Sequence, residues 1–114
     1  MTQPPERVID FQTRHAGIWE AFETLATRCH EAGGPLDEKT RRLVKLGIAV
    51  GHRHEGAVHS ATRQALDAGI APEEIFHAGI LAITTIGWPS AYAALTWMND
   101  VITGRARADA PEPR

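Results

Sequence analysis

Apolar residues recur three or four positions apart along almost the whole chain, which is the spacing of one face of an α-helix. No segment alternates apolar and polar residues as a half-buried β-strand would. Glycines, prolines and capping residues divide the pattern into five expected helices, over residues 14–30, 38–51, 52–68, 72–86 and 90–103. The sequence therefore predicts an all-α fold, a compact bundle of about five helices.

Capping residues support the limits of these helices. Asp37 precedes the second helix, where a carboxylate accepts hydrogen bonds from backbone N–H groups that have no partner in the helix. Gly69 follows the third helix, at a position that favours a left-handed residue. Pro72 occupies the first position of the fourth helix, where proline is well tolerated.

The chain of 114 residues has the length of one small domain with a single core. The polar residues 1–12 include two adjacent prolines and are expected to form an N-terminal arm. Residues 13–104 then make up the helical domain, and residues 105–114 a disordered tail. The expected helix over 72–86 is apolar on nearly every side. Because a domain of this size rarely buries such a helix alone, we expect a homo-oligomer.

Composition excludes several classes of partner. A net charge of −2 gives no basic surface for nucleic acid or for an anionic membrane. No apolar run approaches the roughly 20 residues that span a bilayer, and the first residues lack the features of a signal peptide. Cys29 is the only cysteine, so no intrachain disulfide is expected and the expected location is the cytoplasm.

The candidate chemistry lies in residues 51–59, GHRHEGAVH, which hold three imidazoles and a carboxylate. On one continuous helix His52, Glu55 and His59 would fall within an arc of roughly 60°, and Arg63 would follow one turn later. Imidazole and carboxylate are the usual proton-transfer groups near neutral pH. We therefore expect Glu55 and His59 to form an acid–base pair, with His52 beside them and Arg63 binding a substrate carboxylate.

The same residues admit a structural interpretation. A hydrogen-bonded network of Glu55, His59 and Arg63 would lock one subunit against another. His52, Glu55 and His59 would bind a metal ion only with ligands from elsewhere, because they span about 10.5 Å of helix axis. A metal-binding protein is thus a third interpretation, but no metal and no cofactor is expected. His77, on the apolar helix, is expected to be a core histidine.

A longer stretch of the chain resembles a known family. The resemblance begins at Leu36-Asp-Glu-Lys-Thr-Arg-Arg-Leu-Val and continues through His59 and the sequence Ala-Leu-Asp-Ala-Gly to Pro72-Glu-Glu-Ile. This order is similar to that of the carboxymuconolactone decarboxylase family, which includes the alkylhydroperoxidase D-like proteins. The resemblance implies an alkylhydroperoxidase D-like fold that assembles into a trimer or hexamer, with a dimer as the other option. It also implies a site at the start of the third expected helix.

The chain departs from this family at the redox motif. Peroxidase-type members carry Cys-x-x-Cys-x-x-x-His, and placing His59 on that histidine puts His52 and Glu55 where the cysteines would be. Neither side chain forms a thiolate or a disulfide, and Cys29 lies elsewhere in the pattern. The resemblance is therefore to the cysteine-free branch, and dithiol peroxidase activity is not expected.

These observations predict lyase-type acid–base chemistry on a small organic acid, carried by Glu55 and His59 with His52 and Arg63 beside them. The alternative is a non-catalytic oligomeric or small-ligand-binding module that kept the fold and lost the redox motif. The two differ in what surrounds the pair. An enzyme needs a largely apolar cavity beside Glu55 and His59, whereas an interface lock needs the same residues packed against protein.

Overall fold

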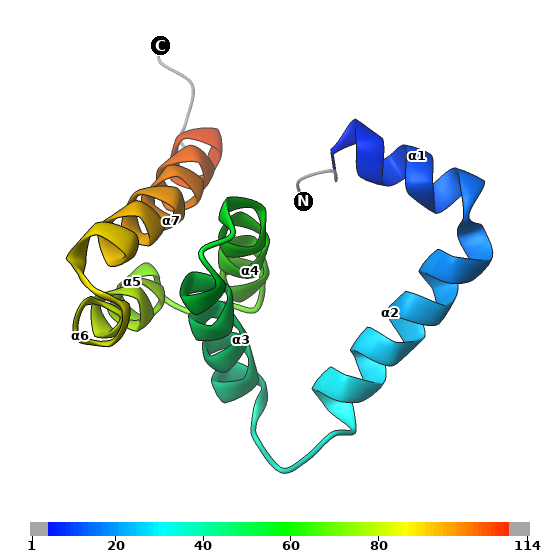
Figure 1. The fold of residues 1–114 in the computed structure, drawn as a ribbon, viewed down its shortest axis with the longest axis horizontal. Helices are drawn as coiled ribbons and strands as arrows, with labels where there is room; N and C mark the ends of the chain where they lie inside the picture. The colour runs from blue at the N-terminus through cyan, green and yellow to red at the C-terminus, as the bar shows by residue number, and fades with distance from the viewer. Residues whose placement is uncertain (1–4, 110–114) are drawn as a thin grey trace. The chain divides into compact units, whose positions relative to one another are not determined.

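A computed structural model describes residues 5–109, and these are almost entirely helical (Figure 1). The helices are α1 (Glu6–Arg14), α2 (Ala16–Glu31), α3 (Glu38–His52), α4 (Glu55–Asp67), α5 (Pro72–Leu81), α6 (Ile83–Ile86) and α7 (Trp88–Asp109). No strand occurs among the described residues, which confirms the predicted all-α fold. The helices belong to two units, one that ends at Pro35 and one that begins at Leu36.

The first unit holds α1 and α2. Residues 6–12 were expected to belong to an N-terminal arm, and in the structure they form most of the helix α1. The ring of Phe11 contacts those of His15 and Trp19 at centroid distances of 5.0 and 6.4 Å. Trp19 in turn contacts Phe22. The contacts of Phe11 with His15 and of Trp19 with Phe22 favour helix over coil, because side chains three or four residues apart meet on one helix face. The contact of Phe11 with Trp19 joins α1 to α2.

The second unit is built on a helical hairpin of α3 and α4, packed against α5 and α7. Asp37 caps α3 as predicted, since its carboxylate accepts a hydrogen bond of 2.8 Å from the backbone N–H of Thr40. Hydrogen bonding from Thr40 lowers the pKa of the Asp37 carboxyl below its usual value. The core gathers large side chains that are almost fully buried: Leu46, Val50, Val58, Thr62, Ile75 and Met98.

Helix boundaries differ from the prediction at three places. α3 continues to His52, and α4 begins only at Glu55, so residues 52–68 do not form one helix. The expected helix over 72–86 is divided at Ala82 into α5 and α6. α7 is longer than expected and includes residues 105–109, which were placed in the disordered tail. The remaining tail residues, and the first four of the expected arm, lie outside the described residues.

α5 is also less completely covered than its composition suggested. Ile75 and Gly79 are buried against the core, but Ile80 and Leu81 are 44% and 60% exposed. Gly79 allows close packing, because a Cβ there would lie 2.7 Å from a methyl group of Leu95 on α7. Within the described residues no helix is long and apolar enough to cross a membrane.

The cap of α3 makes stability depend on pH in a defined direction. Because the folded-state pKa of Asp37 lies below its usual value of 3.8, Asp37 stabilises the fold above that pH. This contribution is lost as the pH falls from 3.8 through the folded-state pKa. We predict that Asp37→Ala lowers the free energy of unfolding at neutral pH, and that the difference from wild type shrinks in this acid range.

Denaturant unfolding at a series of pH values measures this difference. Asp37→Asn is the matched control, because asparagine also caps a helix and does not titrate. A gap between wild type and Asp37→Ala that stays constant down to the lowest pH would show that ionisation of the carboxyl group contributes nothing to the cap.

Candidate functional site

The junction between α3 and α4 is a sharp break between two helices. Arg53 adopts a left-handed conformation with φ of 60°, which ends α3 at His52. His54 then caps α4, since its Nδ1 atom accepts a hydrogen bond of 3.0 Å from the backbone N–H of Ala57. The rings of His52 and His54 lie nearly parallel, with centroids 6.1 Å apart. A left-handed residue other than glycine costs roughly 1–2 kcal/mol, and the cap offsets part of that cost.

The break separates His52 from the helix that carries the other candidate residues. His52 is the last residue of α3, whereas Glu55 is the first residue of α4. The sequence predicted that His52, Glu55 and His59 share one face of a single helix. This prediction is wrong, because His52 lies on α3 whereas Glu55 and His59 lie on α4. What the structure brings together is the pair Glu55 and His59, with Arg63 one turn further along α4.

Glu55 and His59 face one another at a distance just longer than a hydrogen bond. The Nε2 atom of His59 lies 3.9 Å from a carboxylate oxygen of Glu55. This Nε2 atom is buried and has no hydrogen-bond partner among the described residues. Leaving a buried polar atom without a partner costs about 1–3 kcal/mol. The Glu55 side chain is 60% exposed, so a movement of about 1 Å closes the gap to a normal hydrogen bond.

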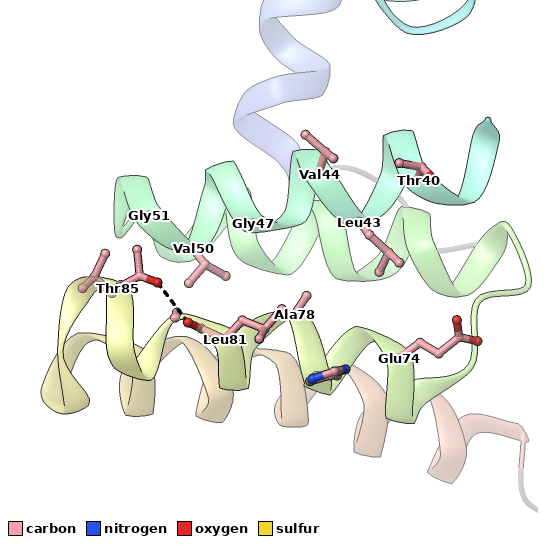
Figure 2. A pocket seen from close by; sticks show the side chains of 13 residues that line it. Thr40, Leu43, Val44, Gly47, Val50, Gly51, Glu74, Ala78, Leu81 and Thr85 are labelled. Atoms are coloured by element: carbon pink, nitrogen blue, oxygen red, sulfur yellow. Dashed lines mark hydrogen bonds between the residues drawn. The ribbon is translucent and has the colours of Figure 1, made fainter. Parts of the chain in front are cut away.

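A separate hollow of the second unit lies between α3 and the pair α5 and α6 (Figure 2). Its volume is about 440 Å³, and its walls are mostly apolar. Figure 2 shows the side chain of Leu43 on α3 pointing toward Ala78 and Leu81 on α5. Gly47 leaves room in the α3 wall, since a Cβ there would meet no atom within 4 Å. We call this hollow the apolar groove.

The apolar groove is not the cavity that was expected beside Glu55 and His59. Its lining residues come from α3, α5 and α6, and they do not include Glu55, His59, His52 or Arg63. Polar groups reach it from other positions: Thr40, Glu74, His77 and Thr85. Of these, Glu74 pairs with Lys39, and the Thr85 hydroxyl donates to the carbonyl of Leu81.

His77 is the residue that sequence reasoning missed. It was expected in the core, but it is exposed and lines the apolar groove. The signal was present in its spacing, because Glu74, His77 and Leu81 are three and four residues apart and so share one face of α5. This face of α5 was not recognised from the sequence, because most of the residues around His77 are apolar.

Metal binding receives no support from the arrangement. Within residues 5–109, no group of three or more histidine, cysteine or acidic side chains is placed to hold a metal ion.

Comparisons with known proteins agree with this fold. Residues 17–100 match the carboxymuconolactone decarboxylase family. The chain therefore belongs to the carboxymuconolactone decarboxylase family. The crystal structure of a protein of this family from Legionella pneumophila, in its apo form, superposes with a TM-score of 0.73. The two chains are 17% identical, and the match covers 86% of each. Among curated proteins the search found no match.

The cap of α4 can be tested by substitution. Because His54 satisfies a backbone N–H of the first turn, we predict that His54→Ala lowers the free energy of unfolding by about 0.5–2 kcal/mol. His54→Asn should keep most of the stability, since asparagine is a strong N-cap residue. Chemical denaturation of the three proteins gives the comparison. Equal stability of His54→Ala and wild type would mean that α4 does not depend on this cap.

Proposed function

We propose that this protein performs lyase-type acid–base chemistry on a small organic acid, with Glu55 and His59 as the proton-transfer pair. The observation that carries the proposal is the Nε2 atom of His59, which is buried without a hydrogen-bond partner among the described residues and lies 3.9 Å from Glu55. A buried atom that the chain itself leaves without a partner is suited to bond a substrate or a transferred proton.

The chemistry is concrete for decarboxylation of a β-keto acid. The carbon–carbon bond to the carboxylate breaks, CO₂ leaves, and the electron pair forms an enolate. Protonated His59 then delivers its Nε2 proton to the enolate carbon, and Glu55 relays a proton from solvent to the imidazole. Glu55 is suited to this relay because its side chain is exposed. The chain supplies both groups without a cofactor.

Two further residues complete the proposed site. Arg63 follows His59 by one turn of α4. In the proposed site its guanidinium binds the carboxylate of the substrate. His52 is exposed at the end of α3. In the proposed site it forms a hydrogen bond to the substrate at the mouth of the site. Dithiol peroxide reduction is excluded from the proposal because Cys29 is the only cysteine. The lone cysteine also supports a cytoplasmic location.

A second candidate function is a small-ligand-binding module without catalysis. The apolar groove favours it, because this hollow of about 440 Å³ is lined by neither residue of the proton-transfer pair. Mostly apolar walls with a few polar groups are typical of small-molecule sites. In this case His77, rather than His59, would contact the ligand.

Assembly into a homo-oligomer is part of the proposal and rests on exposed apolar side chains. On α2, Ile18, Phe22 and Leu25 form one stripe and are 62%, 55% and 61% exposed. No apolar residue described in the first unit is buried. Contiguous apolar surface of this kind marks protein interfaces. A second copy of the chain is the occupant we propose for the α2 stripe, in a trimer, a hexamer or a dimer.

The proton-transfer pair is tested by two conservative substitutions. We predict that Glu55→Gln and His59→Asn each lower kcat/KM by about 10²–10⁴, the usual contribution of a general acid or base. CO₂ release from a panel of β-keto acids measures the activity, and melting temperature and size should stay close to wild type. His77→Asn is the matched control. Loss of activity only in His77→Asn would move the chemistry to the apolar groove.

The same variants separate catalysis from a structural role. If Glu55→Gln and His59→Asn dissociate the assembly or sharply lower the melting temperature, the pair is an interface lock. Full activity in both variants would contradict the proposal directly.

The α2 stripe is tested by introducing a charge. We predict that wild type has a solution mass of at least twice the 12.4 kDa of one chain, and that Phe22→Glu shifts it towards the monomer. Thr27→Glu is the matched control, because Thr27 lies on another face of α2 and should leave the mass unchanged. Light scattering provides the masses. A wild-type mass of 12.4 kDa would contradict the proposed assembly.

A further inference from the structure

A second, smaller cavity lies between α3 and α4 on the other side of α4 from Glu55 and His59. Its volume is about 240 Å³. Seven residues line it: Arg42, Lys45, Ala49, Ala57, Ser60, Ala61 and Gln64. At about 100° per residue, the α4 members of this set point about 150° away from the Glu55–His59–Arg63 stripe. We call it the α3–α4 cavity, and it is separate from the proposed catalytic pair.

A chain of hydrogen bonds holds the polar rim of this cavity in place. Arg42 donates from Nε to Glu38 at 2.8 Å and from Nη1 to the side-chain oxygen of Gln64 at 2.7 Å. Gln64 donates in turn to the hydroxyl oxygen of Ser60 at 3.2 Å. These bonds use two of the five N–H groups of the guanidinium and leave the Ser60 proton able to donate. The rim is therefore fixed and still rich in donors.

The charge around the cavity is positive. Glu38 pairs with two arginines, at 2.9 Å to Arg41 and 2.8 Å to Arg42. Lys45 lies three residues beyond Arg42 on α3 and forms no ion pair within the described part of the chain. These four side chains carry three positive charges and one negative charge. Because the Arg42 side chain is only 24% exposed, its charge is less screened by solvent than that of a free surface arginine.

The floor of the cavity is small and apolar. Ala49, Ala57 and Ala61 leave the space between the two helices open. A volume of 240 Å³ equals that of about eight water molecules in the liquid, enough for a small anion with part of its hydration shell. We propose that the α3–α4 cavity binds a small oxyanion, a carboxylate or a phosphate group, through Arg42, Lys45 and the Ser60 hydroxyl. Guanidinium with an adjacent ammonium is the usual protein partner of such groups.

The probes that test this site are inorganic phosphate and acetate, with chloride at matched ionic strength as the reference. Amide ¹H–¹⁵N spectra of the full chain follow each titration. We expect a saturable change that is confined to residues around the cavity, such as Ser60 and Gln64. A response to phosphate alone identifies a phosphate ligand, and a response to acetate alone identifies a carboxylate. Saturation by neither anion, or the same change with chloride, would overturn the proposal.

Two lysine variants on α3 give a matched comparison. Lys45→Gln should raise the dissociation constant about tenfold, the effect of losing one charged hydrogen bond. Lys39→Gln removes an equal charge from the same helix. Lys39 does not line the cavity and instead pairs with Glu74. If both variants raise the dissociation constant equally, the anion is held only by general charge attraction, and the proposal of a specific site is contradicted.

Two further variants complete the test. Arg42→Lys keeps the charge but loses the planar fork, so it too should weaken binding. Glu55→Gln should leave anion binding unchanged, which separates this site from the proposed catalytic pair. Circular dichroism confirms that each variant is folded. Unchanged binding in both Lys45→Gln and Arg42→Lys would refute the assignment of these residues.

Discussion

The break between α3 and α4 is the constraint on which the rest of the second unit depends. A left-handed Arg53 ends one helix, and the imidazole of His54 starts the next within two residues. So short a connection forces α4 to fold back along α3, which is why Arg42 reaches Gln64, 22 positions later in the chain. The same break sets Glu55 at the first position of α4, one turn before His59.

The hairpin that results presents two different polar surfaces. On one side of α4, Glu55 and His59 approach to 3.9 Å and leave a buried ring nitrogen without a partner within the described residues. On the other side, Arg42, Gln64 and Ser60 are bonded to one another. The first arrangement is incomplete in the chain alone and thus suits proton transfer. The second is held rigid by its own bonds and suits recognition of a charge.

Much of the fold follows from sequence signals that act locally. The helical periodicity, the Asp37 cap and Pro72 at the start of α5 all rest on contacts within one turn, and the structure has each of them. The α3–α4 break left no comparable signal, because Arg53 is not a glycine and His54 is not among the common cap residues. His52 was therefore placed on the wrong helix. The position of His77 on the apolar groove likewise depends on packing between helices, which periodicity alone does not fix.

The central claim is that Glu55 acts on the His59 ring. Long-range ¹H–¹⁵N spectra of the histidine side chains at neutral pH report each ring nitrogen separately. We predict that Glu55→Gln moves the ¹⁵N signals of His59 and leaves those of His77 in place, because His59, unlike His77, lies against this carboxylate. If the ring signals of His59 are the same in Glu55→Gln as in wild type, the two side chains do not act together and the account is contradicted.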